Sequence, residues 1–214
     1  MRDLADDLWG DLQPAASRRL LLAAVEAFAK NGYHNTTTRE IAAAAGMSPA
    51  AVYVHYKSKA ELLRAISQIG HEAAYSTLEA AVVRHAGDPV ECLKAAVAAF
   101  TSWHARNYLV ARVIQDELDS LDIADYEVIL PLRRRTTGLV TNILEAGQAA
   151  GVFAIDDIAL TTRGIFSMII DTARWRRPTT RLSPHQVGIA YANLVLRMVD
   201  TKPVRTDAEK SRSA

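Results

Sequence analysis

The segment TTTREIAAAAGMSPAAVYVHY, residues 36–56, contains the start and stop signals of two short helices. Thr37 and Glu40 form a capping box, which satisfies free N–H groups at the start of a helix. Ser48 repeats the start signal and is followed by a proline at the first helical position, where a missing N–H has no cost. Gly46 lies between the two signals and can take the positive φ that a tight turn requires. The segment therefore predicts two short helices joined by a tight turn.

The two helices can cross at a steep angle only if the side chains at their contact point are small. Ala42 supplies the small residue, Gly46 follows four residues later, and Val52 closes the wedge six residues beyond the glycine. A small residue, a glycine and an aliphatic residue at these spacings are typical of a DNA-binding helix-turn-helix. The two helix caps make the pattern much more specific than these three positions alone.

Helical spacing and caps recur on both sides of this segment. A helix over residues 17–31, with Leu21, Val25 and Phe28 on one face, precedes it. Ser58 and Glu61 form another capping box, which opens a long helix that continues to about residue 85. Five further helices are expected at residues 89–107, 108–120, 124–150, 156–176 and 183–200. The fold class is all-α: an N-terminal three-helix helix-turn-helix domain followed by a helical ligand-binding and dimerisation bundle.

These elements divide the chain into two domains. We expect a helix-turn-helix DNA-binding domain at residues 14–66 and a helical ligand-binding and dimerisation domain at residues 67–202. A homodimer should form on the helices at 156–176 and 183–200, because two apolar helices from each protomer can make a four-helix interface by two-fold symmetry. The apolar residues expected there are Ile165, Phe166, Ile169, Ile170, Ala190, Leu194, Leu196 and Val199.

The composition excludes several classes of protein. The 214 residues are 50% hydrophobic with a formal net charge of +1, which is ordinary for a globular protein. Residues 18–64 nevertheless hold seven lysines and arginines against three glutamates, a local basic region suited to phosphate. Cys92 is the only cysteine, and we expect no disulfide, metal or cofactor. With no long apolar run and no signal peptide, the protein should be cytoplasmic, without a membrane partner. The polar ends, residues 1–13 and 203–214, should fray.

Residues 17–66 resemble the TetR family of regulators. The matching residues are Thr37 to Ala42 (TREIA after the first threonine), Gly46, Ser48 and residues 52–59, VYVHYKSK. The resemblance implies a dimer that binds a palindromic, double-stranded operator, with a body that changes the spacing of its two DNA-reading heads when it binds an effector. The second half of such proteins diverges widely, so the resemblance does not identify the effector.

The expected DNA-binding residues lie on the two short helices and at the start of the next one. They are Thr38, Arg39, Ser48, Pro49, Ala50, Ala51, Tyr53, His55 and Lys59. The resemblance implies phosphate contacts for Tyr53 and His55, although both could instead be packed aromatic residues. We expect Thr38 to contact phosphate as well. Lys59 opposes the helix dipole from the first turn of its helix, and a phosphate bound there would relieve this conflict.

Base reading requires side chains that reach the base edges. Ala50 and Ala51 can contact only thymine methyl groups at the exposed start of the second short helix. Arg39 is a long donor nearby and could reach guanine O6 and N7, or could simply pair with a phosphate.

The ligand-binding residues that we expect lie on the later helices and are mostly apolar or aromatic. They are Phe100, Trp103, Ile114, Glu117, Phe166, Arg174 and Trp175, although aromatic residues on such helices usually form plain core. Residues 114–117 and 171–178 resemble a subset of these regulators that controls lipid and steroid breakdown and responds to acyl-CoA-like thioesters. The partner implied is a small apolar or acyl-CoA-like effector. Arg174 and the arginines at 176–177 could hold CoA phosphates or form a solvated helix end. Arg133 to Arg135 are most simply a solvated face.

Two other functions compete with this interpretation. A helical-bundle enzyme of the di-iron class needs Glu-x-x-His pairs on facing helices, and no glutamate in this chain has a histidine three residues later. No nucleophile elbow, phosphate-binding loop or glycine-rich dinucleotide turn is present in the sequence either. The chain is therefore expected not to be an enzyme. A regulator without a small-molecule effector stays open, because a cavity cannot be recognised from helical periodicity.

Overall fold

A computed structural model describes residues 8–9 and 14–199 of the chain. Within these residues the structure is helical, with no strand, so the predicted all-α fold is confirmed. The helices are α2 (Ala15–Asn31), α3 (Thr38–Ala44), α4 (Pro49–His55), α5 (Lys59–Arg84), α6 (Pro89–Arg106), α7 (Tyr108–Asp116), the 3-10 helix η1 (Leu118–Ser120), α8 (Ile123–Ala149), α9 (Ile158–Trp175) and α10 (Pro184–Met198).

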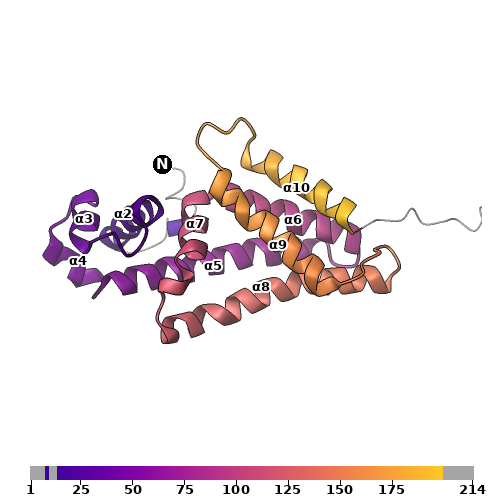
Figure 1. Ribbon diagram of the computed structural model, residues 1–214, viewed down its shortest axis with the longest axis horizontal. Helices are drawn as coiled ribbons and strands as arrows, with labels where there is room; N and C mark the ends of the chain where they lie inside the picture. Colours follow the sequence, from indigo (N-terminus) through magenta and orange to yellow (C-terminus); the bar gives the residue numbers. More distant parts are fainter. Residues whose placement is uncertain (1–7, 10–13, 200–214) are drawn as a thin grey trace, which may run out of the picture.

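Two regions follow one another along the molecule (Figure 1). The head consists of α2, α3 and α4 with the first turn of α5. The body consists of the rest of α5 and the helices from α6 to α10, in which α6 packs against α5, α8, α9 and α10. Helix α5 passes unbroken through the predicted domain boundary at residue 66, so one rigid element belongs to both regions.

The capping signals explain where the helices of the head begin. Thr37 and Glu40 form both hydrogen bonds of the predicted capping box, and the Ser48 hydroxyl accepts from the N–H of Ala51 at the start of α4. At α5 the box is incomplete. Ser58 accepts from the Glu61 N–H, but the Glu61 carboxylate accepts from the N–H of Lys57, 2.6 Å away, which is one residue before the predicted position.

Two further expectations are corrected by the structure. The helix predicted at 108–120 ends at Asp116, and a separate 3-10 turn follows it. The expected fraying of residues 1–13 is wrong at Trp9, whose side chain is only 2% exposed, because burial of so large an apolar ring stabilises it in the core. Leu8 packs partly buried against the same core. Residues 1–7, 10–13 and 203–214 and the predicted domain end at 200–202 lie outside the described residues.

Candidate functional site

The head contains the predicted turn between two crossing helices. Ala42 and Val52 are fully buried where α3 and α4 meet, and Gly46 takes a φ of +67° between them. A residue with a Cβ is strained at this φ, so glycine sets the angle between the helices. The geometry is that of a helix-turn-helix, with α4 in the position of the helix that enters the DNA major groove.

The expected DNA-binding residues of the head are all at least partly exposed to solvent. Those with exposed side chains are Arg39, Ser48, Pro49, Ala50 and Tyr53, and those with half-buried side chains are Thr38, Ala51, His55 and Lys59. The Tyr53 hydroxyl lies 3.2 Å from the Thr38 hydroxyl, so two predicted phosphate contacts from different helices are brought together. The His55 ring is oriented by a 3.3 Å hydrogen bond between its Nδ1 and the Ser17 hydroxyl.

Lys59 lies inside the head rather than at its edge. Its ammonium group donates to the carbonyl oxygens of Tyr33 and Thr36, at 2.6 and 2.9 Å, and lies 4.2 Å from the centre of the Tyr33 ring. These contacts hold the loop between α2 and α3 against the start of α5. A direct contact of Lys59 with phosphate therefore requires that the ammonium group leave some of these partners, and it stays a prediction.

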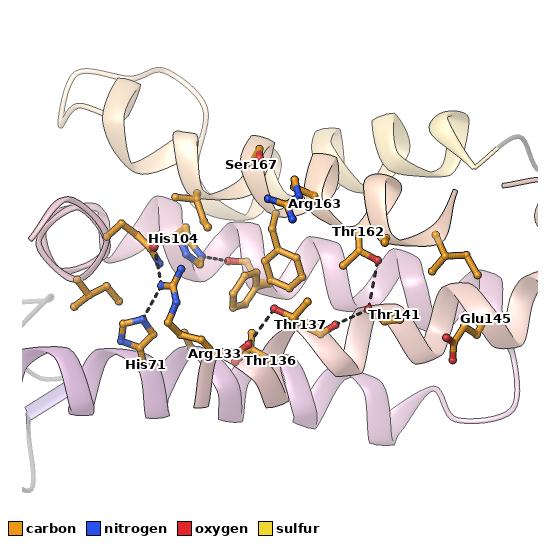
Figure 2. A pocket seen from close by; sticks show the side chains of 18 residues that line it. His71, His104, Arg133, Thr136, Thr137, Thr141, Glu145, Thr162, Arg163 and Ser167 are labelled. Atoms are coloured by element: carbon orange, nitrogen blue, oxygen red, sulfur yellow. Dashed lines mark hydrogen bonds between the residues drawn. The ribbon is translucent and has the colours of Figure 1, made fainter. Parts of the chain in front are cut away.

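The body contains a cavity of about 630 Å³ between α5, α6, α7, α8 and α9 that is partly open to solvent (Figure 2). Its lining residues are His71, Ala74, Phe100, His104, Ile114, Gln115, Arg133, Thr136, Thr137, Thr141, Glu145, Ile158, Ala159, Thr162, Arg163, Phe166, Ser167 and Ile170. A volume of this size is typical of small-molecule sites. Of the residues expected to bind ligand, Phe100, Ile114 and Phe166 line the cavity.

The other four expected ligand residues do not line the cavity. Trp103, on α6, is buried in the hydrophobic core, and Trp175 lies 39% exposed at the end of α9. Arg174 forms a 2.9 Å ion pair with Asp116 on the surface. Glu117 accepts a 3.0 Å hydrogen bond from the Tyr33 N–H, so its carboxylate joins the body to the head.

Charged and polar groups gather at one end of the cavity. The Arg133 guanidinium donates from Nη1 to Gln115 Oε1 at 2.9 Å and to His71 Nε2 at 3.2 Å. His71 and His104 each place Nδ1 within hydrogen-bonding distance of the backbone carbonyl four residues earlier. Burial lowers the pKa of both histidines to about 4, so both rings are neutral at physiological pH.

The interpretation of Arg133 as part of a solvated face is wrong. Arg134 and Arg135 are exposed, whereas Arg133 lines the cavity. The signal that identifies it is present in the sequence. Arg133 lies four residues after Ile129 and three before Thr136, which are both buried, so it falls on the inward stripe of α8.

The outer faces of α9 and α10 carry a different set of apolar residues from the set predicted for dimerisation. Ile165, Ile169 and Val199 are fully buried in the core of the protomer, and Phe166 lines the cavity. The exposed large apolar side chains on these two helices are Leu160, Trp175, Ile189, Leu194 and Met198. Of the residues predicted for the interface, Leu194 lies on this exposed face together with Ala190.

The described part of the chain contains neither a candidate membrane-spanning helix nor a candidate metal site. None of its helices combines the length and the apolar character needed to cross a bilayer. Nor does any group of three or more histidine, cysteine, aspartate or glutamate side chains lie close enough together to hold a metal ion there.

Comparison with known families matches both regions of the chain. Residues 20–66 match the family described as "Bacterial regulatory proteins, tetR family". Residues 86–199 match the family described as "Tetracyclin repressor-like, C-terminal domain". The two matches together cover both the helix-turn-helix and nearly all of the body.

Individual proteins are similar along most of their length. The repressor KstR2 of Mycolicibacterium smegmatis is 31% identical over 189 residues, which cover 86% of this chain and 91% of the relative. The crystal structure of a TetR-family regulatory protein from Rhodococcus RHA1 is 42% identical with a TM-score of 0.81, covering 88% of this chain and 98% of that one. The structure of AibR with isovaleryl coenzyme A and operator DNA is 22% identical with a TM-score of 0.75, covering 84% and 97%.

Proposed function

The chain belongs to the TetR family of bacterial transcriptional regulators, and from that premise we propose that it is a dimeric repressor that a small, largely apolar molecule releases from a palindromic operator. The observation that carries this proposal is the position of α7. Residues of α7 line the cavity, and the residue that follows its C-terminal end is hydrogen-bonded to the head. The operator is the partner at the head, and the effector is the partner in the body. Both partners occur in the cytoplasm, where we expect the protein to act.

DNA recognition is proposed to depend mainly on phosphates. Tyr53 and Thr38 lie together at the edge of the reading surface, where they can contact one phosphate group. Ala50 and Ala51 offer only methyl groups to the major groove, which suit thymine. Arg39 is exposed on α3, and we assign it a guanine contact.

Operator variants test this division of roles. The Arg39→Ala variant should lose about 1–3 kcal/mol of preference at one G·C pair and little affinity for other sequences. Replacing thymine by uracil at the half-site positions facing Ala50 and Ala51 should weaken binding by removing the methyl group alone. Fluorescence anisotropy with a set of labelled operators measures both effects. Equal binding of uracil and thymine at every position would contradict methyl reading.

The effector is proposed to be an acyl-CoA-type thioester whose acyl part occupies the cavity. Phe100, Phe166 and Ile114 supply an apolar lining for such a group. AibR, which shares the fold, has been crystallised in complex with isovaleryl coenzyme A and operator DNA. Arg163 lines the cavity and is exposed, so it offers a positive charge to a CoA moiety that lies outside.

Helix α7 is the route by which we propose that the effector acts on the head. Ile114 and Gln115 of α7 line the cavity. On the same helix Arg112 donates to the Ala29 carbonyl at 3.0 Å, and Glu117 follows directly and accepts from Tyr33. A ligand that shifts α7 therefore shifts the head. An effector that binds the protein about 100-fold more tightly in one head position than in the other, a difference of roughly 2.7 kcal/mol, provides enough coupling to release the operator. Helix α5 offers a second route, because it belongs to both regions.

Dimerisation is proposed to bury the exposed apolar residues of α9 and α10. Leu160, Leu194 and Met198 lie on the outer surface of these helices, and large apolar groups in such positions mark interaction sites. Sedimentation at micromolar concentration should show a dimer, and Leu194→Glu should shift it to monomer. A wild-type monomer would contradict this arrangement.

One experiment tests the whole proposal. Purified protein on labelled operator is titrated with acyl-CoAs, free fatty acids and steroids, and anisotropy reports release. Release by at least one of these ligands is expected, with Phe166→Ala weakening the response while operator affinity without ligand is unchanged. Release by uncharged ligands alone would reject the thioester and retain the cavity as the effector site. Lack of operator binding would reject the function.

A further inference from the structure

We propose that the inner end of the cavity, the end that holds Arg133, His71 and Gln115, binds the carboxylate of an organic acid with an apolar body, and that Arg133 pairs with this carboxylate. This inference rests on the proposed effector-binding function and identifies the chemical class of the effector. Its support comes from the hydrogen bonds of the guanidinium group, the neutrality of its neighbours and the lining of the rest of the cavity.

Arg133 has no acidic partner in the described part of the chain. The arginines Arg64, Arg135 and Arg174 each form an ion pair with a carboxylate, but Arg133 forms none. Its hydrogen-bond partners are a neutral amide oxygen and a neutral imidazole nitrogen. The acidic residue that lines the same cavity, Glu145, lies at the opposite end of it (Figure 2). The positive charge at the inner end is therefore unmatched.

The unused face of the guanidinium has the geometry that a carboxylate requires. Both hydrogen bonds to Gln115 and His71 leave from Nη1, which carries two N–H groups. The N–H groups of Nε and Nη2 form no hydrogen bond with any described residue. These two nitrogens are one edge of the fork by which arginine binds a carboxylate through two parallel hydrogen bonds. Gln115 and His71 thus position the group while leaving that edge available.

The surroundings favour one negative charge. Burial lowers the pKa of Arg133 from its ordinary value, but an arginine remains charged in proteins. A buried charge without a counter-ion is costly, and a ligand carboxylate removes this cost. His71 and His104 are neutral and add no second positive charge. Arg163 also lines the cavity, but its side chain is exposed to solvent, so Arg133 is the cation that lacks a counter-ion, and one cation matches a monoanionic carboxylate.

The remainder of the cavity defines the rest of the ligand. Ala74, Phe100, Ile114, Phe166 and Ile170 provide apolar contacts. The hydroxyls of Thr136, Thr137 and Thr141 donate to carbonyls of their own helix, so they offer acceptors and not additional charge. The ligand is therefore an acid with one carboxylate and a mainly hydrocarbon body. An acyl-CoA satisfies both proposals when its acyl group ends in a free carboxylate.

The test compares acids with their own amides, which differ little in shape but lack the charge. The probes are decanoate, cyclohexanebutanoate and adamantaneacetate, each with its primary amide, and binding to the full-length protein is measured by calorimetry. At least one acid should bind at least 10-fold more tightly than its amide, as expected for a two-point charge-assisted pair. Arg133→Gln should reduce this preference to less than 3-fold, and Arg133→Lys should retain part of it.

The matched control is Arg135→Gln, on the same helix two residues away. Arg135 stacks on Tyr75 at 4.2 Å and has the Glu79 carboxylate as a partner, outside the cavity. This variant should leave the preference for acids unchanged. Circular dichroism and operator affinity show whether Arg133→Gln is folded. If it is not, the acid-over-amide ratio of Arg133→Lys and of the wild type decides the question.

Two results would overturn the inference: no acid binding better than its amide, or the preference surviving in Arg133→Gln. The proposed function fails in a different way. Acids that bind through Arg133 but leave operator affinity unchanged would retain the carboxylate site and reject ligand-triggered release. Release of the operator by amides or plain thioesters, with no advantage for acids, would retain the regulator and reject the carboxylate site.

Discussion

The head and the body differ in how their partly buried cations are paired. In the head, Lys59 donates to two loop carbonyls at 2.9 Å or less, so its charge is used to hold the loop in place. In the body, Arg133 contacts only neutral groups, and one edge of its guanidinium is open to the cavity. The partly buried cation of the head thus already has its partners within the protein, and the exposed groups of the head are the ones that we expect to contact DNA. In the body, Arg133 has no acidic partner among the described residues, and we propose that the carboxylate of an effector supplies one.

The largest expected effect concerns the neutral histidines beside Arg133. The pKa of His71 and of His104 is about 4 in the folded protein, against an ordinary value of 6.5. The unfolded chain therefore binds more protons between these values, so the stability contribution is complete above about pH 6.5 and is lost as pH falls towards 4. Between pH 7.5 and pH 5 the free energy of unfolding should fall by about 2 kcal/mol for each histidine.

Urea unfolding of the ligand-free protein, at a fixed protein concentration, measures this loss. In the double variant with His71→Gln and His104→Gln most of the pH dependence should disappear, whatever the stability of that variant at pH 7.5. An equal free energy of unfolding at pH 7.5 and pH 5 would show that the fold does not lower the pKa of the histidines, which would then be charged at pH 5. The inner end of the cavity would then carry more than one positive charge, and the contrast with the head would be weaker.

The second prediction compares one glycine from each region. In the body, a Cβ at Gly188 on α10 would overlap with the Ala98 carbonyl and the Ser102 hydroxyl of α6. In the head, a Cβ at Gly46 would meet no atom within 4 Å, but its φ of +67° is strained for other residues. Gly188→Ala should cost about 2–3 kcal/mol through overpacking. Gly46→Ala should cost about 1 kcal/mol through backbone strain.

Thermal unfolding and operator binding together separate the two glycine variants. Gly46→Ala should weaken operator binding more than its small loss of stability suggests, because the turn sets the angle between α3 and α4. Gly188→Ala should lower the unfolding temperature more, and operator affinity should be retained at temperatures where the protein is folded. The reverse ranking of stabilities would mean that close helix contact is less important in the body than the structure indicates.

The third prediction concerns replacement of Lys59. The Lys59→Met variant leaves the Thr36 carbonyl without its donor and the Tyr33 carbonyl with only the Thr36 N–H, 3.2 Å away. Operator affinity should fall by about 10-fold, or 1.4 kcal/mol, for all sequences alike. If Lys59 acts only by holding the loop, the dependence of affinity on salt concentration stays as in the wild type. If it also contacts a phosphate, the slope of log affinity against log salt becomes smaller by about 1.

The control for this variant is Lys57→Met, which removes an exposed charge two residues earlier in the head. It should leave the loop carbonyls bonded and change affinity less than Lys59→Met does. Equal effects of the two variants would show that Lys59 contributes only general positive charge. The buried cation of the head would then not have the structural role that distinguishes it from Arg133.

The sequence predicts the head well because its signals are local. Helix caps act over three residues, and Gly46 determines the turn by its own backbone conformation. The helix ends and the turn of the head can therefore be predicted from residues that are close together in the sequence. The cavity draws its lining from five helices that are far apart in the chain, and local spacing alone does not show which faces meet. Periodicity and residue type place Phe100, Ile114 and Phe166 in it correctly, but they do not distinguish Trp103 from the core.

Runs of similar residues explain the other errors. Arg133 stands beside two exposed arginines, although only it lies on the inward stripe of α8. Ile165 and Ile169 are apolar and so suit a dimer interface, but α9 has two apolar faces, and theirs packs into the protomer. Periodicity identifies a face, whereas the packing partner of that face depends on the tertiary structure.

The joint between α7 and the head has a consequence for how such regulators diversify. Two hydrogen bonds of this joint involve main-chain atoms of the head. Arg112 donates to the Ala29 carbonyl, and Glu117 accepts from the Tyr33 N–H. Main-chain atoms are present whatever the side chain, so substitutions on the reading surface leave these bonds intact. We therefore expect that mutations in the head can change the preferred operator while the contacts with the body persist, and that a head from a homologue with the same loop conformation can be grafted onto this body.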